Sequence, residues 1–172
     1  ALRRLCTEHG SVLIFDEVMT SRLHPGGAQA LFGVLPDMTT LGKYLAGGMT
    51  FGAFGGRRSI MAAFDPAQGG ALSQAGTFNN NVVSMAAGVA ALRDVLTPQA
   101  LIALNDRGDE LRDRLNVTFA GAGLPMTVMG VGSMMNVHTP DDRWVALFFH
   151  AMLAAGFYLA RRGMIALALD VT

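Results

Sequence analysis

The first half of the chain alternates short apolar runs with short helical patterns. Residues 11–18 form a continuous apolar run that ends in acids, which is typical of a strand buried on both faces of a parallel sheet. Residues 1–10 have the pattern of the end of a helix that leads into this strand. A second short strand is expected just before Lys43, and a third over the glycine-spaced run 49–56. This order predicts an α/β domain.

Two longer helical patterns follow the expected strands. Residues 82–96 come directly after Asn80 and Asn81, either of which can cap a helix. A second helix is expected to start at Thr97-Pro98, to repeat apolar residues every 3.6 positions and to stop near Gly121. This helix is expected to carry a charged, solvated face made of Asp109, Arg112 and Asp113.

The last third of the chain has a different pattern. Residues 127–139 predict two short strands around a glycine turn, and residues 157–169 predict a strand, a turn and a strand. Between them, Thr139-Pro140 and the acids after it favour a helix over about 140–155. We therefore expect two domains, an α/β part over residues 1–94 and an α+β part over residues 95–172.

One apolar stretch, residues 144–160, is close to the minimum length for a membrane span. His150 lies at its centre and Gly156 interrupts it, so we interpret it as a buried helix of a soluble protein, with no membrane partner. His150 is then a satisfied core or interface histidine rather than a ligand.

Composition excludes several classes of protein. A hydrophobic content of 51% with 15% charged residues excludes a disordered chain. The formal net charge is zero, which argues against binding to nucleic acid. Cys6 is the one cysteine, so no internal disulfide can form and a cytoplasmic location is expected. The four histidines lack ligand spacing, so we expect no metal site.

Lys43 is the single lysine among 13 basic residues, and the others are all arginines. Lysine differs from arginine in that its amine can lose a proton near neutral pH and attack a carbonyl group. Lys43 lies in an apolar, glycine-rich run, LGKYLAGG, which suits a partly desolvated amine. A surface lysine placed there by chance is the alternative. The residue type and its setting make Lys43 a candidate reactive group.

Asp16 is the second candidate, because it ends the apolar run at 11–18. Ligands of open α/β sheets bind at the carboxyl ends of the strands. Val18 points to the same side as Asp16 if the strand continues. A carboxylate beside a branched apolar side chain suits a flat ring with a protonated nitrogen, although Asp16 can also be a simple turn residue. With a lysine after the next strand, these are the parts needed to hold pyridoxal phosphate.

Four motifs carry a resemblance to a known family: DEVMTSR, PDMTTLGK, FGAFGGRRSIM and QAGTFNNNVVSMAAG. In order and spacing they resemble the class III aminotransferases, in the branch that holds glutamate-1-semialdehyde aminomutases and β-amino-acid aminotransferases. The resemblance implies an α/β fold of fold type I, like aspartate aminotransferase. The chain would contain part of the large domain and most of an α+β small domain.

The resemblance also implies a role for each matching residue. Lys43 would form the Schiff base with pyridoxal 5'-phosphate and later move a proton at the substrate carbon. Asp16 would keep the pyridine nitrogen protonated, and Val18 would stack against the ring. Thr77 would reach the cofactor phosphate of a second subunit in a homodimer, although on its residue type alone it can be a turn threonine. Independently of the resemblance, Arg161 and Arg162 are expected in a turn, where either could bind a substrate carboxylate, but a solvated pair is the favoured interpretation.

Two departures from the aminomutase pattern favour an aminotransferase acting on an amino acid, including a β-amino acid, and a keto acid. Only Ser21 stands between Thr20 and Arg22, and the segment after Thr77 reads FNNNV rather than serine–glycine–asparagine–proline. Aminomutase activity, a non-catalytic scaffold and a binder without Schiff-base chemistry are the alternatives. Family members are more than twice as long, so the chain is expected to be a fragment.

Overall fold

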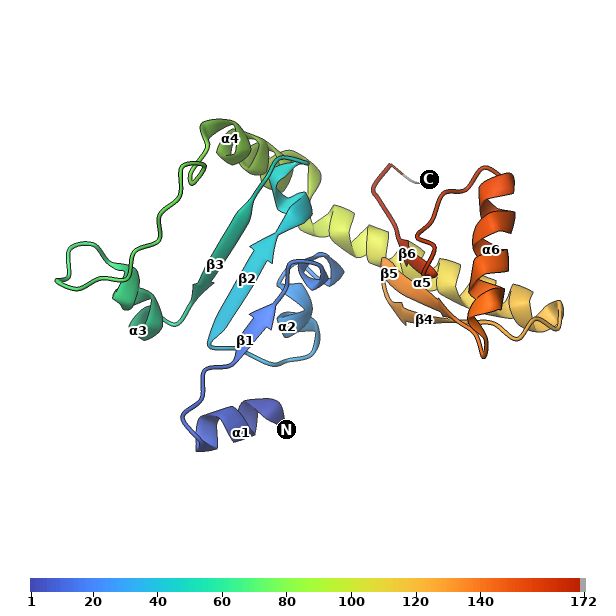
Figure 1. The fold of residues 1–172 in the computed structure, drawn as a ribbon, viewed down its shortest axis with the longest axis horizontal. Helices are drawn as coiled ribbons and strands as arrows, with labels where there is room; N and C mark the ends of the chain where they lie inside the picture. The colour runs from blue at the N-terminus through green and yellow to red at the C-terminus, as the bar shows by residue number, and fades with distance from the viewer. Residues whose placement is uncertain (171–172) are drawn as a thin grey trace. The chain divides into compact units, whose positions relative to one another are not determined.

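The computed structural model describes residues 1–170, with α and β elements in both halves of the chain (Figure 1). The chain divides into two compact units, Ala1–Pro98 and Gln99–Thr172. Each unit contains its own sheet of three strands. The assignment of these units to a large and a small domain remains a prediction.

The sheet of the first unit has the strand order β1-β2-β3. β1 (Ile14–Asp16) runs parallel to β2 (Met38–Gly42), and Asp16 lies opposite Thr40 in the pairing. β3 (Gly52–Gly56) runs antiparallel to β2, with Gly52 opposite Gly42. The sheet is therefore mixed, and the carboxyl ends of β1 and β2 lie at the same edge.

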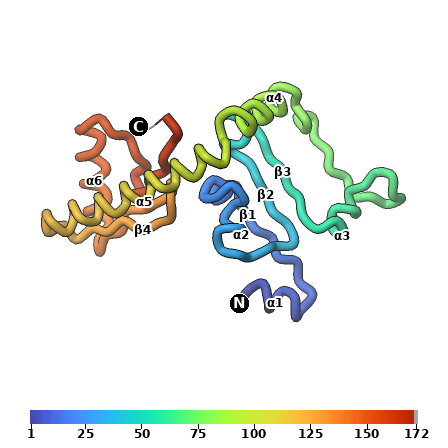
Figure 2. Tube along the Cα trace, turned by 180° about the vertical axis from the view of Figure 1, so that it is seen from behind, coloured from blue at the N-terminus to red at the C-terminus, as the bar shows by residue number. Residues whose placement is uncertain are grey.

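Helices before, between and after these strands confirm most of the predicted pattern. In Figures 1 and 2, α2 lies beside β1 and β2, and α4 lies at the end of the sheet where β2 ends. Asn81, rather than Asn80, caps α4 by accepting bonds from the backbone N–H groups of Val83 and Ser84. The helical elements are α1 (Leu2–Glu8), α2 (Gly27–Leu31), α3 (Arg58–Met61), α4 (Val82–Ala90), the 3₁₀ turns Thr20–Leu23, Lys43–Ala46 and Ala62–Phe64, and a π-helical turn Ala91–Val95.

β1 is shorter and less covered than the sequence predicts. Strand geometry covers only Ile14–Asp16 of the run 11–18. Gln29 on α2 donates a hydrogen bond to Thr39 (3.2 Å), so α2 covers one face of the sheet. On the opposite face Ile14 is 53% exposed, so the expectation of a strand buried on both faces is wrong for residues 1–170.

Asp37, the residue before β2, connects several elements at the edge of the sheet where β2 begins. Its Oδ2 atom accepts hydrogen bonds from the Leu13 N–H group and from Arg3, both at 2.7 Å. Arg57, which follows β3, lies 2.8 Å from Oδ1. The Leu13 N–H bond, followed by the Arg3 bond, lowers the pKa of the buried Asp37 carboxyl below its ordinary value.

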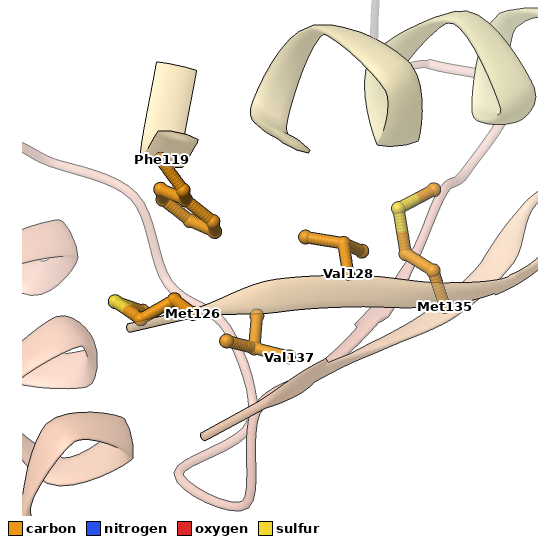
Figure 3. Close-up of a cluster of buried hydrophobic side chains, with 5 residues drawn as sticks. All are labelled: Phe119, Met126, Val128, Met135 and Val137. Carbon is orange, nitrogen blue, oxygen red and sulfur yellow. The ribbon is translucent and has the colours of Figure 1, made fainter. Parts of the chain in front are cut away.

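The second unit packs a long helix against a three-stranded antiparallel sheet. The strand order is β4-β5-β6, and the elements are α5 (Pro98–Gly121), β4 (Thr127–Val131), β5 (Met134–His138), α6 (Asp142–Ala154) and β6 (Met164–Ala166). The hydrophobic core consists of Phe119, Met126, Val128, Met135 and Val137. Figure 3 shows Phe119 pointing from α5 toward the strands, and its ring meets Phe148 of α6 edge to face at 5.7 Å.

The backbone of α5 touches the β4–β5 turn at Gly108. A Cβ atom at this position would overlap the carbonyl oxygen of Gly132. Asn105, one turn earlier, is buried and accepts a hydrogen bond from the Ser133 N–H group at 2.8 Å. The helix and the turn therefore approach so closely that only glycine fits at position 108.

Several expectations for the second unit are correct only in part. Asp109, Arg112 and Asp113 form the expected charged face with Asp113 exposed, but Asp109 also accepts a hydrogen bond from the Gly132 N–H group (2.9 Å), so this face holds the β4–β5 turn as well. The predicted helix forms as α6 with Asp141 as its cap, but the expectation that it is buried is wrong, because no residue of α6 is buried. His150 is exposed. Residues 157–160 form no strand, and only β6 forms in the last segment.

Within residues 1–170, no single helix is long and apolar enough to cross a membrane. One bent pair, Val82–Val95 with Pro98–Gly121, meets the requirement by length and composition alone.

We expect Asp37→Asn to lower the free energy of unfolding of the first unit, because an amide cannot pair with two guanidinium groups. The pKa of this carboxyl is depressed in the folded chain, so its contribution is present above the ordinary value of 3.8 and is lost as the pH falls through the lower folded value. Denaturant titrations should therefore show a gap between wild type and variant at pH 7 that narrows below pH 3.8. Asp94→Asn is the control, because Asp94 forms an exposed pair with its neighbour Arg93. A gap that stays constant with pH would contradict the role of the Asp37 charge.

We expect Gly108→Ala and Gly121→Ala, the same change in one helix, to have opposite effects. At Gly108 the added methyl group meets backbone, and the free energy of unfolding should fall by about 3 kcal/mol. At Gly121 the space is open, and better helix propensity should raise it by up to about 1 kcal/mol. Chemical unfolding measures both, and equal effects would show that the contact between α5 and the turn does not constrain the fold.

Candidate functional site

Asp16 lies at the carboxyl end of β1 with its carboxylate partly fixed. Its Oδ1 atom accepts hydrogen bonds from the Thr40 hydroxyl and from the Val18 N–H group, both at 3.1 Å. Among residues 1–170 its Oδ2 atom has no hydrogen-bond partner, and the side chain is exposed. Asp16 is therefore held in place by β2 while one oxygen stays open to a cationic group.

Val18 lies on the same face as Asp16, next to the end of β2. A Cβ atom placed on Gly42 would be 3.7 Å from Val18 Cγ1. Gly42 follows Thr40 by two positions and so shares its face of the strand. The branched side chain of Val18 is thus packed against bare backbone, one residue before Lys43. The structure brings Asp16, Val18 and the backbone that leads into Lys43 to one edge of the sheet.

Lys43 is the first residue after β2 and has a left-handed backbone. Its φ is 53°, and Asn80 is the one other non-glycine residue of positive φ in residues 1–170. A lysine in this conformation costs about 1–3 kcal/mol, and such strain persists only where the surroundings enforce it. The Lys43 side chain is exposed and makes no hydrogen bond or ion pair within the described residues. Its amine is available to a ligand.

The turn that follows Lys43 is packed tightly against α4. Ala46 has no exposed surface. Gly88 of α4 faces it, and a Cβ atom there would lie 3.5 Å from the Leu45 carbonyl oxygen. Gly47 ends the turn in a left-handed conformation that glycine adopts without strain. This packing fixes the carboxyl-terminal side of the Lys43 turn.

Glu17, which the sequence analysis did not single out, fixes the segment after β1. Its side chain is 1% exposed and accepts hydrogen bonds from the N–H groups of Ala28 (2.8 Å) and Gln29 (2.7 Å) and from the Thr20 hydroxyl (3.0 Å). Gly27, with a φ of 75°, leaves room for the carboxylate, which a Cβ atom would touch. The one feature of the sequence that could have indicated Glu17 is that it is a second acid, directly after Asp16, at the end of an apolar run.

Tyr44, also not singled out, connects the Lys43 turn to that segment. Its hydroxyl lies 2.8 Å from the Ser21 hydroxyl, and the Arg22 guanidinium lies over its ring at 5.9 Å. Burial raises the pKa of the Tyr44 phenol above its ordinary value, more than the Ser21 bond and the Arg22 charge lower it. Burial also lowers the pKa of Arg22. The phenol is therefore neutral at physiological pH.

Thr77 is not part of this group. It is exposed, lies in the segment before α4 and makes no hydrogen bond within residues 1–170. The neighbouring residues of this segment, Gln74 and 78–81, line a cavity of 360 Å³ with β3 and α4. The structure of the single chain thus leaves the predicted role of Thr77 untested.

Arg161 and Arg162 line a separate cavity of 490 Å³ within the second unit. His138 and Thr139, at the end of β5, lie on its wall. Both arginine side chains are exposed, and Arg162 lies 3.1 Å from the sulfur of Met164. Both arginines thus lie in a turn and are exposed, as the favoured interpretation predicts, and they also border this cavity.

The edge formed by Asp16, Val18 and the Lys43 turn combines three groups. These are an open carboxylate oxygen, the branched apolar side chain of Val18 and an available primary amine. A carboxylate stabilises a protonated ring nitrogen, and a primary amine binds an aldehyde covalently. The three groups therefore suit an aromatic ligand that carries a basic nitrogen and an aldehyde.

Comparison with known proteins gives relatives of one kind. The chain is 47% identical over 185 residues to the beta-phenylalanine transaminase of Variovorax paradoxus, and the match covers 100% of this chain and 42% of that protein. It is 46% identical over 174 residues to a glutamate-1-semialdehyde 2,1-aminomutase of Laribacter hongkongensis, over 93% of this chain and 40% of that protein. The chain therefore spans less than half the length of the curated relatives it matches.

Solved structures agree with these relatives. The crystal structure of the Variovorax paradoxus beta-phenylalanine aminotransferase matches with a TM-score of 0.95 at 47% identity, over 99% of this chain and 43% of that one. A transaminase solved with PLP bound matches with a TM-score of 0.94 at 34% identity, over 99% of this chain and 42% of that one. These matches confirm the predicted fold type I architecture and that the chain corresponds to part of such a protein. The sequence model of the aminotransferase class-III family matches residues 1–170, and the chain belongs to this family.

Proposed function

We propose that the protein containing this chain is a pyridoxal-phosphate-dependent aminotransferase that moves an amino group from an amino acid to a keto acid. The observation that carries the proposal is Lys43, an available amine held in a strained left-handed turn beside Asp16 and Val18. The first unit would then belong to the large domain and the second to the small domain of the complete enzyme.

The residues at this edge fit pyridoxal phosphate. Asp16 has one carboxylate oxygen fixed by Thr40 and Val18 and one oxygen open, which is what a protonated pyridine nitrogen requires. Val18 offers a branched apolar surface to a ring, and the bare backbone of Gly42 leaves that surface accessible. Lys43 has no competing partner among residues 1–170. Within residues 1–170, neither Asp16 nor Lys43 forms an ion pair that the cofactor would have to displace.

Each residue would then have a distinct part in amino transfer. Pyridoxal phosphate, when bound, supplies an aldehyde for the amine and a ring that takes up the electrons left after proton loss. Lys43 would hold the cofactor by its amine, release it to the substrate amine and then carry the proton at the substrate carbon. Asp16 would keep the ring nitrogen charged, and Val18 would hold the ring against the sheet edge.

A β-amino acid is the favoured amino donor within this proposal. The Variovorax paradoxus relative, named for β-phenylalanine, supports this class, and so do the short TSR segment and FNNNV. The Laribacter hongkongensis aminomutase, at 46% identity, keeps intramolecular amino transfer as the second candidate. The two activities differ in whether a separate keto acid is consumed.

The quaternary arrangement is part of the proposal. Thr77 is exposed beside a cavity, and its hydroxyl would bind the cofactor phosphate of a second subunit in a homodimer. The exposed apolar side chains Val82, Val83 and Val89 on α4 support a covered surface in this region. A single cysteine, Cys6, supports a reducing compartment, and a cytoplasmic location is proposed on that basis.

Borohydride trapping of the full-length protein tests the central step. We expect pyridoxyl label on the peptide that contains Lys43, and no label on that peptide in Lys43→Arg, because a guanidinium does not react with the aldehyde. Amino-transfer rates should fall by at least about a hundredfold in Lys43→Arg and should also fall in Asp16→Asn. Asp65→Asn is the matched control, because Asp65 follows the 3₁₀ turn Ala62–Phe64 and its side chain bonds only Ala67 and Gln68 within residues 1–170.

The same experiment separates the alternatives. Label on a different lysine, or full activity in Lys43→Arg, would refute the assignment of Lys43. Absence of label in the wild-type full-length protein would instead support a non-catalytic scaffold. Conversion of glutamate-1-semialdehyde without a keto acid would identify the aminomutase.

A further inference from the structure

We propose that Tyr44 is a positioning residue that holds the backbone of Lys43 in its reactive conformation through Ser21 and Arg22. This inference rests on the proposed function, since it concerns the amine that would bind the cofactor. Tyr44 itself does not have to touch cofactor or substrate. It acts on the residue that precedes it, and its partners belong to the segment that follows Asp16 and Val18.

Two contacts connect Tyr44 to that segment. The Tyr44 and Ser21 hydroxyls are 2.8 Å apart and partly buried. The Arg22 guanidinium lies over the Tyr44 ring at 5.9 Å, a separation at which a cation is attracted to the ring face. Both contacts are made by adjacent residues of one 3₁₀ turn, Thr20–Leu23. They therefore fix both the tip of the Tyr44 side chain and its ring.

The segment that holds Tyr44 is itself anchored. The buried Glu17 carboxylate accepts the Thr20 hydroxyl at 3.0 Å and binds the start of α2 through the N–H groups of Ala28 and Gln29. In addition, the Ser21 N–H group donates to the Glu17 carbonyl oxygen at 3.0 Å. Ser21 is thus a fixed point and not a mobile surface residue. A continuous series of contacts runs from Glu17 through the 3₁₀ turn to Tyr44.

The conformation of Lys43 is one that such a constraint explains. A left-handed lysine relaxes to an ordinary backbone unless its neighbours prevent it. Gly42 on one side is fixed by its pairing with Gly52, and Ala46 on the other side is buried against α4. Tyr44 lies between Gly42 and Ala46, and its side chain connects the turn to the segment that follows Asp16. Without this contact the backbone of Lys43 would sample conformations other than the left-handed one that the structure shows.

The full-length protein with single and paired substitutions tests this role. Tyr44→Phe removes the hydroxyl and keeps a ring for Arg22, and Ser21→Ala removes the same bond from the other end. We expect each change to slow the capture of pyridoxal phosphate at Lys43 about fivefold, as measured by timed borohydride trapping and peptide mapping. The double variant should be no slower than either single variant, because both remove one bond. Tyr158→Phe, which changes the exposed second tyrosine, is the matched control.

A second readout needs no cofactor. Hydrogen–deuterium exchange of residues 43–47 should become faster in Tyr44→Phe and in Ser21→Ala. The exchange is measured at a temperature well below the unfolding midpoint. A purely structural role of Tyr44 would leave the trapping rate unchanged. Steady-state kinetics should show the loss in kcat rather than in KM, because the substrate contacts are intact.

Wild-type exchange and trapping rates in Tyr44→Phe would overturn the inference, and so would additive losses in the double variant. If the wild-type protein is not labelled at Lys43, the proposed function fails, whereas the exchange measurement still decides whether Tyr44 holds the turn. Normal labelling in the wild type with no effect of Tyr44→Phe would remove only the positioning role.

Discussion

The parallel pairing of β1 with β2 is the constraint on which the candidate site depends. This pairing puts Asp16 opposite Thr40, and therefore Val18 beside the last residue of β2. A slip of one residue would turn Asp16 to the face that α2 covers and would bring Glu17 to the open face. The register thus decides which of two adjacent acids is open to a ligand and which is buried as a structural anchor.

Buried carboxylates fix the two ends of the β1–β2 pair. At the start of β2, Asp37 binds Arg3, Arg57 and the Leu13 N–H group, and at the end of β1, Glu17 binds the start of α2. Both carboxyl groups accept hydrogen bonds from backbone N–H groups, an arrangement that holds a buried carboxyl group firmly. The positions of β1 and β2 are therefore set by polar contacts at both of their ends, while the side chain of Asp16 at the ligand edge stays exposed.

The sequence predicted local structure well where the signal is local. The α5 pattern, its glycine stop and the asparagine before α4 appear in the structure because caps and periodicity act over a few residues. Asp16 and Lys43 could be singled out by residue type and by their places after apolar runs. Glu17 and Tyr44 could not, because their partners Ala28 and Ser21 become neighbours only after folding. The exposed α6 shows a further limit of prediction from sequence. An apolar pattern predicts that a helix face is buried, but it does not indicate which part of the protein buries it.

The left-handed backbone of Lys43 has an evolutionary consequence. Glycine or asparagine would occupy this conformation more comfortably than lysine does. In a descendant of this protein that no longer used the amine, substitutions toward those residues would be neutral for activity and favourable for folding. Under the proposed function, selection for the amine would oppose the preference of the backbone at this position.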